Sequence, residues 1–395
     1  MTTNLHDYIK SKSEELLEKV NAYREHLHAN PELSFQEFET AEFVCSKLEL
    51  LGIKTEKIGK TGVIGLIMGD HHNLSDSFIG LRADIDALPI MEENEVSYKS
   101  KIPGKMHACG HDVHTSILLG TAEILVAKRN ELKHPIKLIF QPGEEKNPGG
   151  ASILISEGVL KNPIVNKMYA LHVFPEMEVG NIGFKEGLYM ASCDEIYITI
   201  HGKGGHGAMP HQCVDPILIG ANLLTSLQQI VSRSCDPKIP CVLSFGHFEG
   251  LGATNVIPST VYLKGTFRTM DEDWRKKALE LIKTQSNLIA ETFGGSADVE
   301  ISNGYPCLFN DETLTQELKM KSEVFFGSSQ VKELPIRMTS EDFAFYSQEI
   351  PVCFLRLGVG NSAKGISFGV HHPRFDIDQN ALIIGMQTMC LAVID

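Results

Sequence analysis

The spacing of hydrophobic positions in the N-terminal part of the chain predicts two helices. Between residues 5 and 29 apolar side chains recur at close to helical spacing. This predicted helix ends at Asn30-Pro31, because the residue before a proline is disfavoured in the α conformation. Ser34 and Glu37 match a capping box, so we expect a second helix from there to about Leu51.

From residue 63 to residue 171, short apolar runs alternate with helical patterns. The predicted strands are 63–68, 78–83, 136–140 and 167–171, and the predicted helices are 115–128 and 148–157. Such alternation is typical of an α/β fold, in which helices flank a largely parallel mixed sheet. In sheets of this kind ligands bind beyond the carboxyl ends of the strands.

A different pattern occupies residues 190–304. Its predicted elements, in order, are strand 194–200, helix 216–231, strands 242–248 and 261–268, helix 273–292 and strand 297–302. The order β-α-β-β-α-β predicts a ferredoxin-like α+β sandwich. We therefore expect a main domain formed by residues 1–189 and 305–395, with residues 190–304 inserted into it.

Composition narrows the class of protein. The chain has 395 residues, of which 43% are hydrophobic and 22% charged, as in soluble globular proteins with more than one domain. A net charge of −14 without a basic stripe argues against nucleic-acid binding, and no segment has the pattern of a signal peptide or a membrane span. Nine scattered cysteines are typical of reduced thiols. We expect a cytoplasmic protein that binds neither nucleic acid nor membranes.

The stretch KMHACGHDVHT, residues 105–115, is unusually rich in side chains that bind metals. It contains His107, Cys109, His111, Asp112 and His114. One isolated histidine would more often be an ordinary core or loop residue. Imidazole, thiolate and carboxylate at this density instead indicate a zinc-type metal site, provided that other segments add ligands.

Further polar side chains follow the predicted strands. Asp84 and Asp86 follow the strand that ends at residue 83, Glu144-Glu145 follow the strand that ends at residue 140, and His172 follows the strand that ends at residue 171. The carboxyl ends of parallel strands meet at one edge of a sheet, so we expect these groups to meet there.

The candidate ligands are too many for one ion. They are Cys109, His111, Glu145, His172 and His371. A tetrahedral ion that keeps a water takes only three protein ligands, so we expect two ions that share Cys109 or a water as a bridge. Adjacent glutamates cannot both reach one ion comfortably, which leaves Glu144 free as a general base.

Other residues near these ligands have two interpretations each. We expect His114 to support a ligand rather than bind metal. Asp112 could orient an imidazole or cap the following helix. His371 and His372 compete for one ligand role.

Three residues of the inserted domain are candidates for binding substrate. His206 lies among glycines in GKGGHGAMPH, where a turn histidine and a ligand-binding one are equally expected. Asn255 could be a turn residue. Arg268 could form a surface salt bridge or bind a substrate carboxylate in a bidentate manner.

Long stretches of the chain are similar to one family. The matching stretches are HLHANPELSFQEFET, LRADIDALPI, HACGHDVH, FQPGEE, ALHVFP, GKGGHGAMPH, TNVIP, GTFRT, SEDFAFY and VHHPRFDID. On these, the chain resembles the amidohydrolase branch of the M20 metallopeptidase family, which includes hippurate hydrolases, N-acyl-amino-acid deacylases and auxin-conjugate hydrolases. The resemblance implies a zinc-exopeptidase-like catalytic domain with an inserted lid domain, through which members commonly form homodimers.

The resemblance also implies roles for individual residues. It assigns the metal ligands as Cys109, His111, Glu145, His172 and His371, the last because the family's final ligand lies two residues before a proline. Glu144 is implied as the base, and we count Asp84 with it as catalytic. His206 is implied to steady the oxyanion, in its own or a partner's site, and Asn255 and Arg268 to lie near the substrate carboxylate.

At two positions near the metal ligands the chain differs from the dizinc peptidases of the wider family. The dizinc peptidases of the wider family carry a histidine ligand where this chain has Arg82, and Cys109 replaces their bridging aspartate. Both features favour the amidohydrolase branch over the exopeptidases. They leave the ions open among Zn, Mn, Co and Ni.

The resulting hypothesis is a hydrolase with two divalent metal ions that cleaves N-acyl amino acids. Metal-bound hydroxide would attack the amide carbonyl, with Glu144 as general base. The alternatives are a dipeptidase of the same family, a non-catalytic ligand-binding member, and a thiol hydrolase that uses Cys109.

Overall fold

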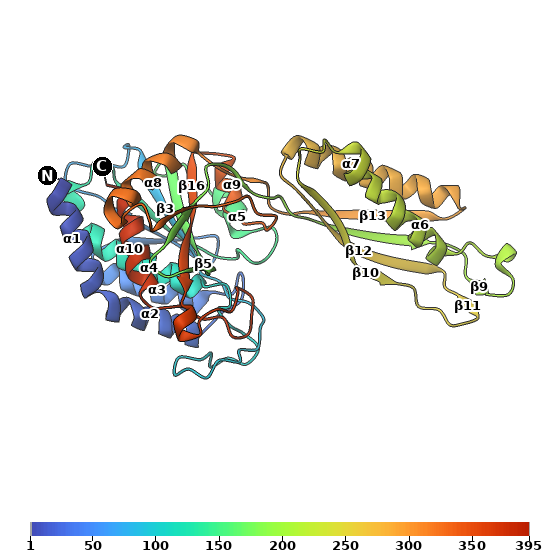
Figure 1. Ribbon diagram of the computed structural model, residues 1–395, viewed down its shortest axis with the longest axis horizontal. Coiled ribbons are helices and arrows are strands. Elements are labelled where there is room, and N and C mark those ends of the chain that lie inside the picture. The colour runs from blue at the N-terminus through green and yellow to red at the C-terminus, as the bar shows by residue number, and fades with distance from the viewer. Residues whose placement is uncertain (1, 395) are drawn as a thin grey trace. The chain divides into compact units, whose positions relative to one another are not determined.

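A computed structural model describes residues 2–394, and the chain forms two compact units (Figure 1). Unit 1 contains the chain up to Gly187, the segment Phe309–Pro335 and the chain from Asp342 onward. Unit 2 consists of Leu188–Leu308 and Ile336–Glu341. The predicted insertion, residues 190–304, lies inside unit 2.

Unit 1 is built on an eight-stranded sheet that is parallel at its centre. The strands in spatial order are β1 (Thr55–Ile58), β2 (Gly62–Ile67), β4 (Ile136–Gln141), β3 (Phe78–Asp84), β5 (Val165–Glu178), β16 (Val352–Gly360), β6 (Ile182–Phe184) and β15 (Val331–Glu333). Strand β3 runs parallel to β4 and β5, β5 runs parallel to β16, and β15 runs parallel to β6. The pairs β1 with β2, β2 with β4, and β6 with β16 are antiparallel. The predicted mixed, largely parallel sheet is confirmed.

Helices flank this sheet. They are α1 (Thr2–Glu15), α2 (Leu17–Ala29), α3 (Phe38–Leu50), α4 (His111–Val126), α5 (Gly150–Ser156), α8 (Glu312–Phe326), α9 (Ala344–Ser347) and α10 (Ala381–Leu391), with 3-10 turns at Arg129–Glu131 and Ser362–Lys364. Helix α4 packs on β3 between α2 and α10, which explains why almost all of its side chains are buried. Every residue of β3 is buried too, as expected for a central strand covered on both faces.

The predictions for the N-terminal helices were wrong in two details. The helix predicted over residues 5–29 is two helices, α1 and α2, which meet at Leu16. Ser34 and Glu37 do not form a capping box, because both side chains bond elsewhere. The Ser34 hydroxyl donates to Asp86 at 2.6 Å, and the Glu37 carboxylate accepts from the Thr61 hydroxyl at 2.7 Å.

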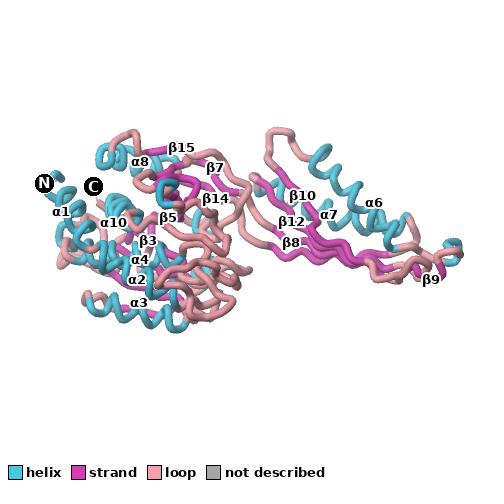
Figure 2. Tube along the Cα trace, turned by 60° about the horizontal axis from the view of Figure 1, so that its bottom comes forward, coloured by secondary structure: helices cyan, strands magenta, loops and turns pink. Residues whose placement is uncertain are grey.

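Unit 2 is a ferredoxin-like sandwich with its own core. Its antiparallel sheet has the order β10 (Cys241–Glu249), β12 (Thr260–Thr269), β8 (Asp194–His201) and β13 (Ser296–Asn303). The helices α6 (Pro216–Gln229) and α7 (Glu272–Thr292) lie together on one face of this sheet (Figure 2). Both helices are capped by aspartates, Asp215 and Asp271, whose carboxylates accept from backbone N–H groups.

The remaining elements are short. They are β7 (Gly187–Met190) paired with β14 (Leu308–Asn310), β9 (Gly205–His206) paired with β11 (Val256–Ile257), a 3-10 turn at Pro210–Gln212 and a π-helical turn at Ile230–Ser234. Among the described helices, none combines the length and the apolar character that crossing a bilayer requires.

Candidate metal centre

Three central strands bring the predicted ligands to one edge of the unit 1 sheet. Asp84 is the last residue of β3, and Glu144-Glu145 follow β4 after the turn at Pro142-Gly143. His111 is the first residue of α4, which starts four residues earlier than predicted. His172 lies within β5, which continues to Glu178, so the prediction that it follows a strand was wrong.

The structure brings all five candidate ligands together. Their donor atoms form overlapping groups in which all atoms lie within 4.8 Å of one another: Cys109, His111 and His172; Cys109, Glu145 and His371. The Cys109 sulfur lies 3.4 Å from His172 Nε2, and His371 Nε2 lies 3.2 Å from Glu145 Oε1. Cys109 belongs to both groups, so its sulfur lies within reach of donor atoms of each.

The chemistry of these donors fits a divalent metal. Nitrogen, sulfur and carboxylate oxygen are the donors that zinc and its neighbours accept. His111 Nε2 is buried, and it forms no hydrogen bond with any part of the chain that the structure describes. A buried nitrogen without a partner costs free energy unless a ligand or ion completes it, so its orientation supports a metal at this point.

Hydrogen bonds fix the orientation of two imidazole rings. His111 Nδ1 lies 3.1 Å from Asp86 Oδ1, and His172 Nδ1 donates to the Val173 carbonyl at 2.8 Å. In both rings Nε2 is then free to face the metal position. Asp86 also accepts from the backbone N–H of Glu145 at 3.0 Å, so one carboxylate positions two candidate ligands.

His371 rather than His372 is placed among the ligands. His371 adopts a φ of 65°, which is rare for a residue with a side chain, and its N–H donates to the Ala108 carbonyl at 2.7 Å. The ring of His372 instead stacks on Phe368, with the ring centres 4.3 Å apart. The strained backbone at His371 therefore directs its side chain toward Glu145.

Asp84 and His114 form a buried pair behind the ligands. His114 Nε2 accepts from the Val173 N–H at 2.9 Å, so Nδ1 carries the ring proton and donates to Asp84 Oδ1 at 2.6 Å. Arg82 donates to the other oxygen of Asp84 at 2.7 Å. Asp84 Oδ2 also lies 3.7 Å from His111 Nε2, so this pair is within reach of the metal position.

Asp112 and His107 face other groups. Asp112 contacts the imidazole of His28 at 2.7 Å and accepts from Arg24 at 3.0 Å, so it orients a histidine that is not a candidate ligand. The residue that precedes α4 as its cap is Gly110, not Asp112. Burial lowers the pKa of His107 to about 4, which keeps that ring neutral.

The centre carries a strong negative potential. Burial opposes a positive charge on His111, but the carboxylates of Asp84, Asp86 and Glu145 outweigh it and raise the pKa of that ring to about 10. Burial and the nearby Glu145 and Glu144 carboxylates raise the pKa of the Cys109 thiol well above its usual value. A divalent cation would neutralise this potential and favour the thiolate.

Glu144 is held by a turn that sequence reasoning did not connect with the N-terminal segment. The Gly143 N–H and the Phe35 N–H both donate to Glu37 Oε1, at 2.9 and 2.8 Å. A Cβ atom on Gly143 would lie 2.3 Å from the Phe35 ring, so only glycine fits this turn. Glu144, which is 7% exposed, accepts from the Asp342 N–H at 3.3 Å. Of the two acidic residues that position the site, Asp86 was indicated by its place after a predicted strand, whereas Glu37 had been assigned only to a capping box.

The three predicted substrate-binding residues all belong to unit 2. His206 on β9 pairs with Val256 on β11, next to Asn255, and both His206 and Asn255 are exposed. Arg268 lies near the other end of β12, where it donates to the Met338 carbonyl at 3.2 Å. Thr260, where β12 starts, and Arg268 are roughly 26 Å apart along the strand. Asn255 precedes Thr260 and lies beside β11, which is beyond that starting end of β12 (Figure 1). One copy of unit 2 therefore does not bring them to the same carboxylate.

Comparison with known proteins decides the family. Residues 80–395 match the model of Peptidase family M20/M25/M40. The chain belongs to this family. It is 43% identical to an N-acyl-L-amino acid amidohydrolase of Geobacillus stearothermophilus, over 76% of this chain and 80% of that protein. It is 39% identical to the IAA-amino acid hydrolase ILR1-like 5 of Arabidopsis thaliana, over 95% of this chain and 86% of that protein.

A solved structure of an M20 protein has a similar fold over nearly the whole length of this chain. The YXEP protein of Bacillus subtilis, a dinuclear metal binding peptidase from the M20 family, matches with a TM-score of 0.82 and 33% identity, over 96% of this chain and 98% of that one. These relatives place the M20 chain in the amidohydrolase branch, as predicted. They support a metal-dependent hydrolase that cleaves amides, with two divalent ions at the ligand groups described above.

Proposed function

We propose that this M20 hydrolase cleaves the amide bond of N-acyl amino acids to give a carboxylate and a free amino acid. The observation that carries the proposal is the pair of ligand groups sharing Cys109, with the nearly buried Glu144 beside them. The name of the Geobacillus relative supports the substrate class.

Each residue has a distinct role in this proposal. Cys109, His111, Glu145, His172 and His371 hold two divalent ions of Zn, Mn, Co or Ni. When bound, these ions would polarise the amide carbonyl and make a water molecule more acidic. Glu144 takes a proton from the attacking water and returns it to the leaving amine. Asp84 keeps His114 and Arg82 in place around the centre.

Unit 2 supplies the substrate contacts in this proposal. His206 stabilises the oxyanion, and Asn255 and Arg268 lie near the substrate carboxylate. Since one copy of unit 2 separates Asn255 from Arg268, the proposal requires residues from two copies at each site. This is consistent with a homodimer formed through unit 2. The free state of all nine cysteines fits the cytoplasm, which we propose as its location.

A matched pair of variants at the adjacent glutamates tests the proposed mechanism. Glu144→Gln should retain metal and lose turnover by at least about a thousandfold, because the amide side chain cannot accept the proton. Glu145→Gln should lose both metal and turnover. Metal content by mass spectrometry and hydrolysis of N-acetyl amino acids measure the two effects. Normal turnover by metal-loaded Glu144→Gln would contradict the role of Glu144.

A substrate panel separates this function from its alternatives. Protein reconstituted with each metal is assayed on N-acyl amino acids and on dipeptides with a free amino group. Preference for the dipeptides would support a peptidase, and no hydrolysis of either class would support a binding protein. A chelator should abolish activity, whereas a thiol hydrolase using Cys109 would remain active without metal.

A further inference from the structure

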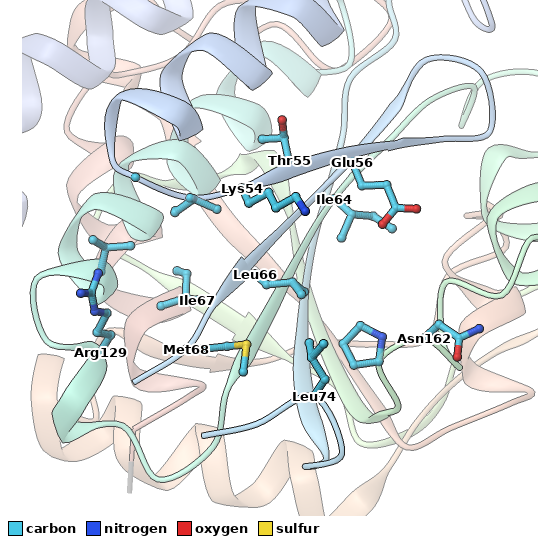
Figure 3. A pocket seen from close by; sticks show the side chains of 14 residues that line it. Lys54, Thr55, Glu56, Ile64, Leu66, Ile67, Met68, Leu74, Arg129 and Asn162 are labelled. Atoms are coloured by element: carbon cyan, nitrogen blue, oxygen red, sulfur yellow. The ribbon is translucent and has the colours of Figure 1, made fainter. Parts of the chain in front are cut away.

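A cavity in unit 1, about 690 Å³ in volume, lies against the hairpin formed by β1 and β2 (Figure 3). Thr55 pairs with Gly65, so alternate side chains of the two strands share the face on which the cavity lies. Ile64 and Leu66 of β2 form an apolar wall, and Leu74, which is 64% exposed, extends it. The volume is in the range of small-molecule sites.

This cavity is separate from the metal centre. At the start of β4, Ile136 pairs with Ile67, which lines the cavity. At the end of β4, Gln141 pairs with Asp84 of the metal centre. These two ends of β4 are roughly 17 Å apart. Ile64, which pairs with Ile139 nearer to Gln141, also lines the cavity, but none of the five candidate metal ligands does.

The cavity combines apolar walls with a surplus of positive charge. Lys54 and Arg129 both line it, and neither side chain has an ion-pair or hydrogen-bond partner among residues 5–394. Glu56 also lines the cavity, but its charge is opposed by the buried ammonium of Lys137, the cross-strand neighbour of Leu66. Burial lowers the pKa of Lys137 to about 8, so this ammonium is still charged at neutral pH.

We propose that this cavity binds an amphipathic monocarboxylate. The alkyl chain would lie on Ile64, Leu66 and Leu74, and the carboxylate beside Lys54, in the positive field to which Arg129 adds. Figure 3 shows the Lys54 ammonium extending over the apolar wall, as this arrangement requires. The proposal does not depend on the proposed function, because no group of the metal centre takes part in it.

Calorimetric titration of the full-length protein with decanoate tests the proposal. Saturable binding is expected, and a shorter probe, hexanoate, should bind more weakly because it covers less of the apolar wall. Replacing both cations, in Lys54→Met with Arg129→Met, should weaken decanoate binding about tenfold or more. The matched control is Lys57→Met with Arg233→Met. Lys57 lies on the opposite face of β1, and Arg233 lies in unit 2. This double variant removes the same amount of positive charge as the test variant and should leave decanoate binding unchanged.

Two further measurements distinguish this cavity from the metal centre, which could also bind a carboxylate. Decanoate should still bind after the metals are removed with a chelator. A decanoate analogue with a photoreactive diazirine should label peptides that contain residues 52–74. The proposal is overturned by the absence of saturable binding, by equal weakening in the test and control variants, or by labelling confined to peptides of the metal centre.

Discussion

At the scale of single residues, Glu37 connects the N-terminal segment with the turn that carries Glu144. Its buried carboxylate accepts from the N–H groups of Phe35 and Gly143 and from the Thr61 hydroxyl. We expect Glu37→Ala to lower kcat about tenfold to a hundredfold, because three donors, two of them in buried hydrogen bonds, lose their acceptor and the turn is free to move.

A conservative variant separates positioning from charge at this residue. Glu37→Gln keeps an acceptor for the two N–H groups, and its amide can donate to the Thr61 hydroxyl. Steady-state kinetics should therefore show near-normal kcat for Glu37→Gln, with KM little changed in both variants. If glutamine failed to restore kcat, or if only KM changed, Glu37 would not act by positioning the turn.

The sequence revealed the candidate ligands more readily than the residues that hold them. His111 and Cys109 are visible because histidine and cysteine are rare and cluster in HACGHDVH. The position of Asp86 after a strand placed it at the site, but its bonds to His111 and Glu145 are visible only in the fold. Glu37 is an ordinary acidic residue whose role arises only when distant segments meet. The competing pattern of a capping box gave Glu37 a local role that the tertiary contacts override.

At the scale of elements, helix α4 carries His111 and packs closely against its neighbours through Gly120. A Cβ at Gly120 would lie 2.4 Å from the Met386 sulfur and 2.7 Å from Val20 Cγ2. We expect Gly120→Val to lower the free energy of unfolding by about 1–3 kcal/mol, since overpacking outweighs the gain from removing a helical glycine. The measurement is thermal unfolding of the metal-loaded protein.

An exposed position provides the control for this helix. Ser46 lies on the exposed face of α3, so Ser46→Val tests a valine in a helix without a packing clash. It should change stability by no more than about 0.5 kcal/mol. A Gly120→Val variant as stable as this control would mean that α4 and α10 can separate without cost.

Element types were predictable from the sequence, whereas several boundaries were not. The order of strands and helices in unit 2 could be predicted from the spacing of its hydrophobic residues alone. This was possible because each element there has one buried and one exposed face. The start of α4 was missed since its first turn is occupied by buried polar residues, which lack an amphipathic pattern. The break between α1 and α2 at Leu16 leaves the apolar spacing uninterrupted, so periodicity could not reveal it.

At the scale of the whole molecule, a large hydrophobic cluster of unit 1 and the hydrophobic cluster of unit 2 share no residue in the part of the chain that the structure describes. One core contains Val113 and Leu355 of unit 1, and the other contains Leu223 and Ile282 of unit 2. All five candidate metal ligands belong to unit 1. Metal binding should therefore stabilise unit 1 alone, because a ligand stabilises only the folded unit that binds it.

Scanning calorimetry of the intact protein can test this independence. We expect two unfolding transitions, of which a chelator lowers the Tm of only one. Ile282→Ala should lower the Tm of the other transition, since removing this fully buried side chain costs about 2–5 kcal/mol within the unit 2 core. In Ile282→Ala, the chelator should lower the Tm of the unit 1 transition by as much as it does in the unchanged protein. The reason is that metal removal and the substitution act on separate cores. A single transition that responds to both changes would show instead that the two units unfold together.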